Sequence, residues 1–292
     1  MVPTTMYNIL VTGAKGQLGS ELRDLSLVYP EYDFFFTVQK DLDISDHKAV
    51  QEFISAKSIT VIINCAAYTQ VDKAETERTL ANTINNLAVE NLAKIAKSRG
   101  IVLIHISTDY VFDGCACEPY TESDTTNPQN VYGKTKLDGE NAMIRINPAD
   151  SIIIRTSWLY SSYGTNFVNT MLRLAREKKE LNVISDQVGT PTYAGSLAKT
   201  ILELLPKIKN KDVEIYHYSN DGQCTWYKFA KAIFETAKID IKVNPIPTSA
   251  YPTAAKRPIY SMLDKEKIKK DYKVAILHWK DALEVCLEKI KN

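Results

Sequence analysis

The chain has 292 residues, of which 45% are hydrophobic and 24% are charged, a mixture typical of a folded globular protein. Its 36 basic and 35 acidic residues give a formal net charge of +1, so it lacks the basic field that nucleic-acid backbones require. No stretch approaches the roughly 18 consecutive apolar residues of a membrane span, and residues 1–5 carry no basic leader. Composition therefore excludes nucleic-acid and membrane partners and predicts a cytoplasmic protein.

The cysteines favour the same compartment. There are five of them, an odd number scattered along the chain, which is typical of reduced thiols in a reducing environment. Cys115 and Cys117 have the spacing of half a metal site, but no matching pair of Cys or His follows them. We therefore expect no metal centre.

Short apolar runs rich in β-formers alternate with helical patterns over the first half of the chain. The runs are continuously apolar, as in parallel strands that are buried on both faces. Right-handed crossovers between such strands give an α/β fold with a doubly wound, Rossmann-type parallel sheet. Asp46 indicates the start of one helix and Gly100 the end of another. The expected strands are residues 9–12, 34–38, 60–65, 102–107 and 152–155, and the expected helices are residues 17–28, 46–57, 79–99 and 130–144.

The alternation loosens beyond residue 156, where prolines break the chain into shorter elements. We expect residues 1–155 to form a dinucleotide-binding domain and residues 156–292 a smaller C-terminal substrate lobe, interleaved with the sheet. The basic stretch at residues 265–270 is expected to form the solvated face of a terminal helix. Helical patterns recur at residues 167–178, 197–205, 226–237 and 279–290.

Gly13, Gly16 and Gly19 follow the first predicted strand and open the first predicted helix. At such a junction the first glycine permits a tight turn, the second lets the backbone approach a pyrophosphate, and the third lets the helix pack closely on the strand. The N-terminus of the helix adds free N–H groups and a partial positive charge. This placement predicts a dinucleotide site.

The end of the second predicted strand bears on which dinucleotide binds. It carries Gln39 and Lys40, without the acid that binds the ribose 2′-hydroxyl in NAD-selective sites, and Asp33 lies at the start of that strand. This pattern favours the 2′-phosphate of NADPH, although NADH stays possible. The alternative for Lys40 is an ordinary solvated loop lysine.

Tyr132 and Lys136 open the helix that follows the fourth predicted strand. Residues four apart share one face of a helix, so the Lys136 ammonium is expected beside the Tyr132 phenol. A neighbouring cation favours the phenolate, and we expect it to lower the pKa of Tyr132 and improve the phenol as a proton donor.

Thr108 lies just past the fourth predicted strand, at the carboxyl edge of the sheet, where open α/β proteins bind ligands. Its hydroxyl is suited to hydrogen-bond a developing oxyanion. Separately, a Thr in a turn and a Tyr–Lys pair on a helix have ordinary structural explanations. Together behind a nucleotide loop, they indicate hydride transfer from a nicotinamide to a carbonyl, with Tyr132 protonating the new alkoxide.

The chain resembles the short-chain dehydrogenase/reductase superfamily in its extended, sugar-nucleotide-using form, and within it the family of dTDP-4-dehydrorhamnose reductases. The resemblance implies NAD(P)H-dependent reduction of the 4-keto group of dTDP-4-dehydro-6-deoxy-L-mannose to dTDP-L-rhamnose. It extends over nearly the whole chain and is carried by residues 13–19, 64–69, 71–75, 107–112, 132–136, 155–158, 186–192, 247–252 and 257–258.

The resemblance also implies roles for individual residues. Thr108, Tyr132 and Lys136 would be catalytic, with Lys136 also holding the nicotinamide ribose. The implied substrate contacts are Thr108, Asp109, Tyr132, Trp158 and Arg257, where Arg257 would clamp the pyrophosphate and Trp158 has a core tryptophan as its alternative. The implied cofactor contacts are Gly13, Gly16, Gln17, Leu18, Gly19, Asp43, Ile44, Ala67, Tyr68, Thr69, Ile106, Tyr132 and Lys136.

One departure from the family concerns a metal. Some members form a dimer around Mg²⁺ held by three glutamates. Glu21 matches the first of these, but Gly195 stands where the second is expected. A hard cation without that carboxylate would be poorly held. We therefore expect no Mg²⁺ between subunits, and a monomer and a homodimer both remain open.

Two alternative functions remain. Sugar-nucleotide dehydratases and epimerases share the fold, and dehydratases carry Thr-Asp-Glu where this chain has Tyr110 after Asp109. A tyrosine cannot serve as the base of that elimination at neutral pH. The other alternative is a non-catalytic binding subunit, like the regulatory subunit of methionine adenosyltransferase, for which the three catalytic side chains would not be required.

Overall fold

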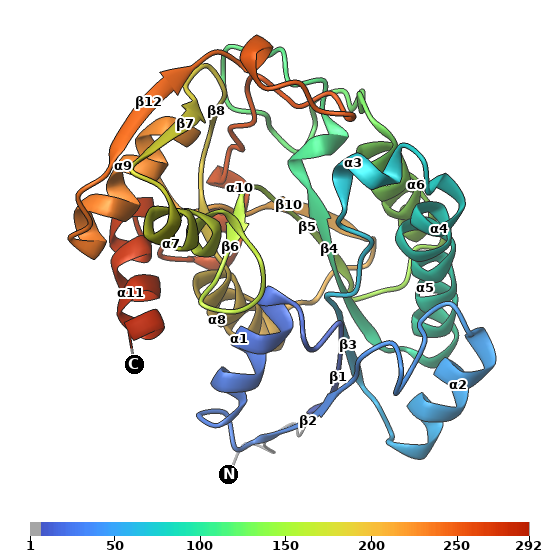
Figure 1. Cartoon of the computed structure of the whole chain (residues 1–292). Coiled ribbons are helices and arrows are strands. Elements are labelled where there is room, and N and C mark those ends of the chain that lie inside the picture. The colour runs from blue at the N-terminus through green and yellow to red at the C-terminus, as the bar shows by residue number, and fades with distance from the viewer. Residues whose placement is uncertain (1–6, 292) are drawn as a thin grey trace.

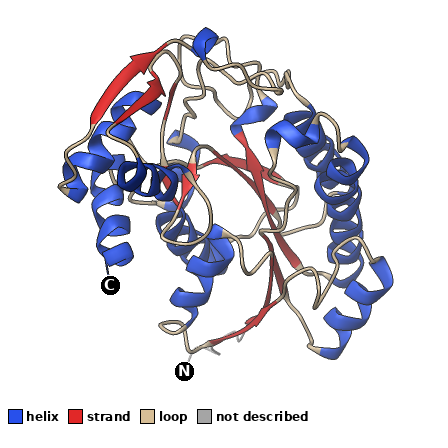
Figure 2. Cartoon of the chain, viewed as in Figure 1, coloured by secondary structure: helices blue, strands red, loops and turns tan. Residues whose placement is uncertain are grey.

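A six-stranded sheet forms the centre of the computed structural model, which describes residues 7–291 (Figures 1 and 2). The absence of a basic leader in residues 1–5 concerns a segment outside the described residues. Every neighbouring pair in the order β10-β5-β4-β3-β1-β2 is parallel, which confirms the predicted doubly wound α/β fold. The strands are β1 (Tyr7–Thr12), β2 (Tyr32–Phe36), β3 (Val61–Asn64), β4 (Val102–Thr108), β5 (Ile152–Thr156) and β10 (Glu214–His217).

Helices cover both faces of this sheet (Figure 1). Successive side chains of β3 alternate between two apolar clusters, since Val61 and Ile63 join one and Ile62 the other. Burying one such side chain stabilises the fold by ~1.5–3 kcal/mol. One face is covered by α1 (Gln17–Ser26) and α8 (Ala194–Leu204), and the other by α2 (His47–Ala56), α5 (Ala88–Arg99) and α6 (Val131–Ile146).

The predicted helix ends are confirmed where capping residues mark them. The Asp46 side chain accepts from the backbone N–H of Ala49 at 3.0 Å and caps α2. Gly100 ends α5 in the left-handed conformation, with φ of 63°. None of the helices within residues 7–291 combines the length and apolar character needed to cross a membrane.

The helix predicted over residues 79–99 is interrupted. It comprises α4 (Arg78–Asn82), a π-helical turn (Thr83–Leu87) and α5, and it follows the short helix α3 (Val71–Ala74). The wide turn directs Asn85 inward, where its side chain bonds the backbone N–H and C=O of Tyr68 at 2.9 and 3.1 Å. This tertiary contact leaves no trace in the apolar periodicity.

The second lobe lies beside the sheet, around α7, α9 and α11 (Figure 1). These helices pack on a separate apolar cluster centred on Phe229. They match the predicted helices, but the paired short strands of the lobe were not predicted. The helices are α7 (Phe167–Glu177), α9 (Trp226–Ala237) and α11 (Trp279–Lys291), and the paired strands are β6 (Leu159–Tyr160) with β9 (Thr192–Tyr193), β7 (Glu180–Ile184) with β12 (Lys242–Ile246), and β8 (Val188–Gly189) with β11 (Cys224–Thr225).

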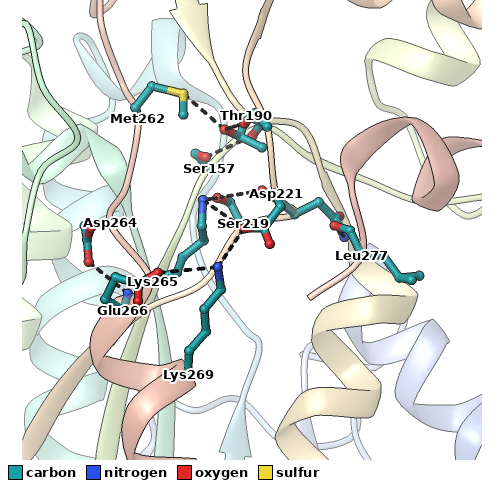
Figure 3. A network of polar contacts seen from close by, with 12 residues as sticks. Ser157, Thr190, Ser219, Asp221, Met262, Asp264, Lys265, Glu266, Lys269 and Leu277 are labelled. Atoms are coloured by element: carbon teal, nitrogen blue, oxygen red, sulfur yellow. Dashed lines mark hydrogen bonds and ion pairs between the residues drawn. The ribbon is translucent and has the colours of Figure 1, made fainter. Parts of the chain in front are cut away.

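The basic stretch at residues 265–270 overlaps α10 (Glu266–Tyr272), which is not the terminal helix, and the expected solvated face is confirmed for Glu266 and Lys270 but wrong for Lys265. Lys265 is only 8% exposed, and its ammonium lies 3.6 Å from Oδ1 of Asp221 (Figure 3). Lys269 reaches the same oxygen at 3.2 Å, because residues four apart lie on one side of a helix. Burial lowers the pKa of Lys265, against the opposing effect of Asp221. The stretch therefore anchors α10 to the loop after β10.

Candidate active site

A cavity of about 750 Å³ opens at the carboxyl edge of the sheet, beyond the ends of β1, β3, β4 and β5. Ligands of open α/β folds bind at this edge. Every residue predicted to contact cofactor or substrate lines the cavity except Tyr68 and Arg257. The structure therefore brings together residues that are spread over about half of the chain.

The glycine turn forms one end of this cavity. Gly13 has φ of +65°, and a Cβ on it would lie 2.7 Å from the backbone nitrogen of Ala66. A Cβ on Gly19 would lie 2.6 Å from the carbonyl oxygen of Gly13. Gly16 precedes α1, and no side chain caps the first N–H groups of that helix. The turn thus presents free backbone donors to an anion.

Beyond this turn, Asp43 and Ile44 line the same end of the cavity. The carboxylate of Asp43 accepts from the backbone N–H of Ser45 at 2.9 Å and from its hydroxyl at 2.7 Å. The backbone bond and the hydroxyl bond lower the pKa of Asp43, so this side chain is ionised at neutral pH.

The proton-transfer residues meet at the opposite end, where α6 begins. The Asn130 side chain caps α6 by accepting from the backbone N–H of Gly133 at 2.8 Å. A Cβ on Gly133 would lie 2.2 Å from the carbonyl oxygen of Tyr110, so this glycine lets α6 approach the turn after β4. The close approach brings Tyr132 and Thr108 to the same cavity wall.

Lys136 lies one turn further along α6 and is buried. Its Nζ donates to the carbonyl oxygen of Ile106 at 2.6 Å and lies 3.3 Å from Nε2 of His105. The other ring nitrogen of His105 lies 3.0 Å from the Asn64 amide, which in turn accepts from the Thr12 hydroxyl at 2.7 Å. A buried polar line across β1, β3 and β4 therefore supports the ammonium, and the sequence analysis had not identified it.

The pKa values around Tyr132 differ from the expectation. Burial raises the pKa of Tyr132, the hydrogen bond with Thr108 lowers it, and the charge of Asp109 raises it further. The prediction that Lys136 lowers this pKa is therefore wrong: its ammonium is bonded to the Ile106 carbonyl rather than to the phenol. Burial also lowers the pKa of Lys136, to about 8. The phenol thus keeps its proton at neutral pH.

Asp109 adds a buried carboxyl group beside the phenol. It is 4% exposed, and its Oδ1 accepts from the Thr108 hydroxyl at 3.0 Å. Its Oδ2 has no hydrogen-bond partner in the described part of the chain. Burial raises the pKa of Asp109 to about 7. A buried carboxyl oxygen without a partner next to a cavity is suited to accept a hydroxyl group of a ligand.

The two predicted residues that do not line the cavity are held by other groups. The Tyr68 hydroxyl donates to Oε2 of Glu77 at 2.7 Å. Arg257 donates through Nη1 to the Tyr110 hydroxyl at 3.0 Å and through Nη2 to Oδ2 of Asp72 at 2.6 Å. Arg257 is therefore one side chain away from the cavity, because Tyr110 lines it.

Parts of the lining were missed by the sequence analysis. Gln39 and the exposed Lys15 line the cavity, whereas Lys40, the residue that favoured a 2′-phosphate, does not. Gly164 and Thr165 come from the loop after β6, and the Asn169 side chain donates to the carbonyl oxygen of Gly164 at 2.9 Å. Lys15 lies within the glycine motif, so the sequence could have indicated it. No sequence pattern indicated the loop that contains Gly164 and Thr165.

The residues around Glu21 do not fit a divalent cation. The Glu21 carboxylate is buried and accepts from the Ser161 hydroxyl and from the ammonium of Lys289, both at 2.6 Å. A Cβ on Gly195 would lie 2.5 Å from the ring of Tyr193, so that ring fills the position of a second carboxylate. Lys289 therefore supplies the positive charge that compensates Glu21.

Comparison with known proteins shows the family of the chain. The family model described as the RmlD substrate binding domain matches residues 7–292. The chain is 41% identical over 287 residues to a dTDP-4-dehydrorhamnose reductase of Aggregatibacter actinomycetemcomitans, covering 95% of this chain and 97% of that one.

Two solved structures of this family resemble the whole chain. The dTDP-4-dehydrorhamnose reductase of Clostridium acetobutylicum is similar with a TM-score of 0.91 at 43% identity, covering 98% of this chain and 100% of that one. The Bacillus anthracis reductase, solved in complex with NADP, has a TM-score of 0.92 at 39% identity, with coverage of 98% and 100%. The chain therefore belongs to the dTDP-4-dehydrorhamnose reductase family, within the extended short-chain dehydrogenases/reductases.

Proposed function

We propose that this chain reduces the 4-keto group of dTDP-4-dehydro-6-deoxy-L-mannose with NADPH and forms dTDP-L-rhamnose, the last step of dTDP-L-rhamnose synthesis. The observation that carries this proposal is one cavity that is lined both by the glycine turn and by Thr108, Tyr132 and Lys136. A phenol, a hydroxyl and a buried ammonium at such an edge are the groups that carbonyl reduction needs.

The glycine-turn end fits a dinucleotide. The N–H groups of α1 that lack a side-chain cap would hold the pyrophosphate, and Asp43 and Ile44 would lie beside the adenine. Ala67, Thr69 and Ile106 would line the path to the nicotinamide, with Tyr68 held between the first two by Asn85. When bound, NADPH supplies the hydride. NADPH rather than NADH is favoured because the end of the second predicted strand carries Gln39 rather than an acid, whereas Asp43, further along the cavity wall, accepts from Ser45.

Tyr132 would supply the proton. As the hydride reaches C4 of the sugar, the C=O bond becomes an alkoxide, and the phenol proton neutralises it. The raised pKa of Tyr132 keeps that proton in place until the alkoxide, a stronger base, forms. Thr108 would hydrogen-bond the developing oxyanion, and the Lys136 ammonium, which bonds the Ile106 carbonyl rather than the phenol, would hold the nicotinamide ribose.

The remaining predicted residues would hold the sugar nucleotide. Oδ2 of Asp109 would accept a sugar hydroxyl, and the indole of Trp158 would cover the apolar face of the 6-deoxysugar. Arg257 would contact the pyrophosphate of the dTDP part at the rim, next to its partner Tyr110. Burial raises the pKa of Tyr110, so its phenol keeps its proton at neutral pH and cannot act as the base of a dehydratase.

The Tyr132→Phe variant tests this function directly. We expect NADPH oxidation with dTDP-4-dehydro-6-deoxy-L-mannose, generated in situ, to slow by on the order of 10²–10⁴-fold, because the proton donor is removed. The Michaelis constant for NADPH should change little and should lie below that for NADH. An unchanged rate in Tyr132→Phe, or turnover of a UDP-keto sugar alone, would contradict the proposal.

A further inference from the structure

Two motifs, residues 186–192 and 247–252, take no part in the proposed chemistry, yet hydrogen bonds join them. The Thr248 backbone N–H and hydroxyl both donate to the carboxylate of Asp186, at 2.9 and 2.6 Å. Gln187, which is 3% exposed, donates through Nε2 to the Thr248 hydroxyl at 3.2 Å. Its Oε1 accepts from the indole N–H of Trp226 at 3.1 Å. Hydrogen bonds through Gln187 thus connect both motifs to the indole ring of Trp226.

That indole stacks on the tryptophan of the cavity wall. The rings of Trp226 and Trp158 have centroids 3.6 Å apart and planes inclined by only 8°. Trp158 lines the cavity, whereas Trp226 does not. Trp226 therefore acts on a ligand only through Trp158.

Trp158 needs such support because its backbone is strained. It has φ of +48°, a left-handed conformation that is unfavourable for a bulky residue. The same motif holds it: the Trp158 carbonyl accepts from the Thr192 N–H at 3.2 Å, and Ser157 donates to the Thr190 carbonyl at 3.0 Å (Figure 3). A Cβ on Gly189 would lie 2.6 Å from the Trp158 ring, so only glycine leaves room for the indole.

We propose that Trp226 is a positioning residue: held by Gln187, it fixes the plane of Trp158 as a rigid wall for the apolar face of a deoxysugar. This inference rests on the proposed function. It also assigns a common task to the two motifs. Residues 186–192 provide Gln187, the hydrogen-bond partner of Trp226, and the space at Gly189, and Thr248 of the other motif holds Gln187. A wall fixed in advance binds its ligand without first ordering a side chain.

Kinetics of Trp226→Leu, Trp226→Phe and Trp279→Phe test the proposal. Trp279 lies in the same apolar cluster, packs on Phe229 and serves as the control. We expect Trp226→Leu to raise the KM for the sugar nucleotide about three- to tenfold, with the KM for NADPH unchanged. Phe should restore part of the loss, and the control should leave both constants unchanged. An unchanged sugar KM in folded Trp226→Leu, or an equal rise in both constants, would overturn the proposal.

Circular dichroism separates this inference from the proposed function. The stacked indoles should give an exciton couplet that Trp226→Phe and Trp158→Phe remove and that Trp279→Phe retains. Gln187→Leu keeps both indoles but removes the hydrogen bond to Trp226, so it should weaken the couplet and raise the sugar KM. This variant tests the proposal even if Trp226→Leu does not fold. If the wild type shows no turnover, the reductase proposal fails. The positioning role of Trp226 is then tested by the affinity for dTDP-L-rhamnose. A lower affinity in Trp226→Leu supports this role, and an unchanged affinity overturns it.

Discussion

Lys136 shows how a single buried ammonium serves the proposed cofactor site beside Tyr132. Its Nζ bonds the carbonyl of Ile106, a residue that lines the cavity, and it lies one helical turn from Tyr132. We predict that Lys136→Met weakens NADPH binding and also lowers kcat by on the order of 10²-fold, because the ribose, and with it the nicotinamide, is no longer held in position beside Tyr132. Lys134→Met, on an exposed position of the same helix, is the matched control. Loss of neither property in folded Lys136→Met would contradict the assignment.

Asp109 gives a prediction about how the stability of the protein changes with pH. Burial raises its pKa to about 7, whereas an unfolded Asp titrates near ~3.9. Between these values the native state holds a proton that the unfolded chain has lost, so stability falls as pH rises through this window and levels off above it. Asp109→Asn removes this effect, and its melting temperature should rise relative to wild type from pH 5 to pH 8.

Asp113 provides a control, because its pKa is shifted in the opposite direction. The hydrogen bond from Tyr120 lowers the pKa of Asp113, so its contribution to stability is complete above the unfolded pKa and is lost only in acid. Asp113→Asn should therefore destabilise by a constant amount between pH 5 and pH 8. A difference for Asp109→Asn that is equally constant over this range would show that Asp109 is already ionised at pH 5.

At the scale of residues, sequence predicts what local geometry requires and misses what tertiary packing decides. Gly13 was predicted because a tight turn needs a glycine. The four-residue spacing of Tyr132 and Lys136 correctly placed both on one cavity, but spacing does not determine where an ammonium points, and the sign of the pKa shift was wrong. Trp226 had no signal, because its partner Trp158 is far away in the sequence.

At the scale of elements, burial explains which predictions held. The strands β1, β3 and β4 were predicted because their central residues are buried on both faces and are therefore mostly apolar. The two-residue strands β6 and β9 are too short for any periodicity and exist only because their partners lie nearby. The lysines of α10 were misjudged for a related reason, since Asp221 comes from a distant segment.

The contact between helices α1 and α11 gives a prediction about stability. Lys289 of α11 pairs with Glu21 and Asp24 of α1, at 2.6 and 2.5 Å. Lys289→Met leaves the buried Glu21 carboxylate without its cation, and we expect a loss of about 1 kcal/mol in the free energy of unfolding, since Lys289 itself is 31% exposed. Urea unfolding measures it, with Lys291→Met on an exposed position of the same helix as control.

The same contact predicts the response to a chelator. Because an ammonium already compensates Glu21, dialysis against EDTA should leave the melting temperature of the wild type unchanged. A chelator-dependent loss of stability, restored by Mg²⁺, would show that a metal ion rather than Lys289 compensates this carboxylate.

At the scale of the molecule, the later half of the chain completes the sheet of the earlier half. β10 pairs with β5, and α8 packs on α1 across the same sheet face. One apolar cluster therefore contains Ile9 and Val11 together with Leu197 and Ile201. The interleaving could be anticipated from the loosened pattern after residue 156, but not which later strand enters the sheet, because that depends on a crossover spanning β6 to α8.

This shared core predicts one cooperative unfolding transition for the whole chain. All three tryptophans, Trp158, Trp226 and Trp279, lie after residue 155, so their fluorescence reports the second lobe, whereas far-UV circular dichroism reports every helix. The two thermal curves should coincide. NADPH at 100 times its Kd should shift both by the same ~2.7 kcal/mol, although its proposed pyrophosphate site, the glycine turn, belongs to the first half of the sequence. A fluorescence transition that precedes the dichroism, or that NADPH leaves in place, would mean that the lobes unfold independently.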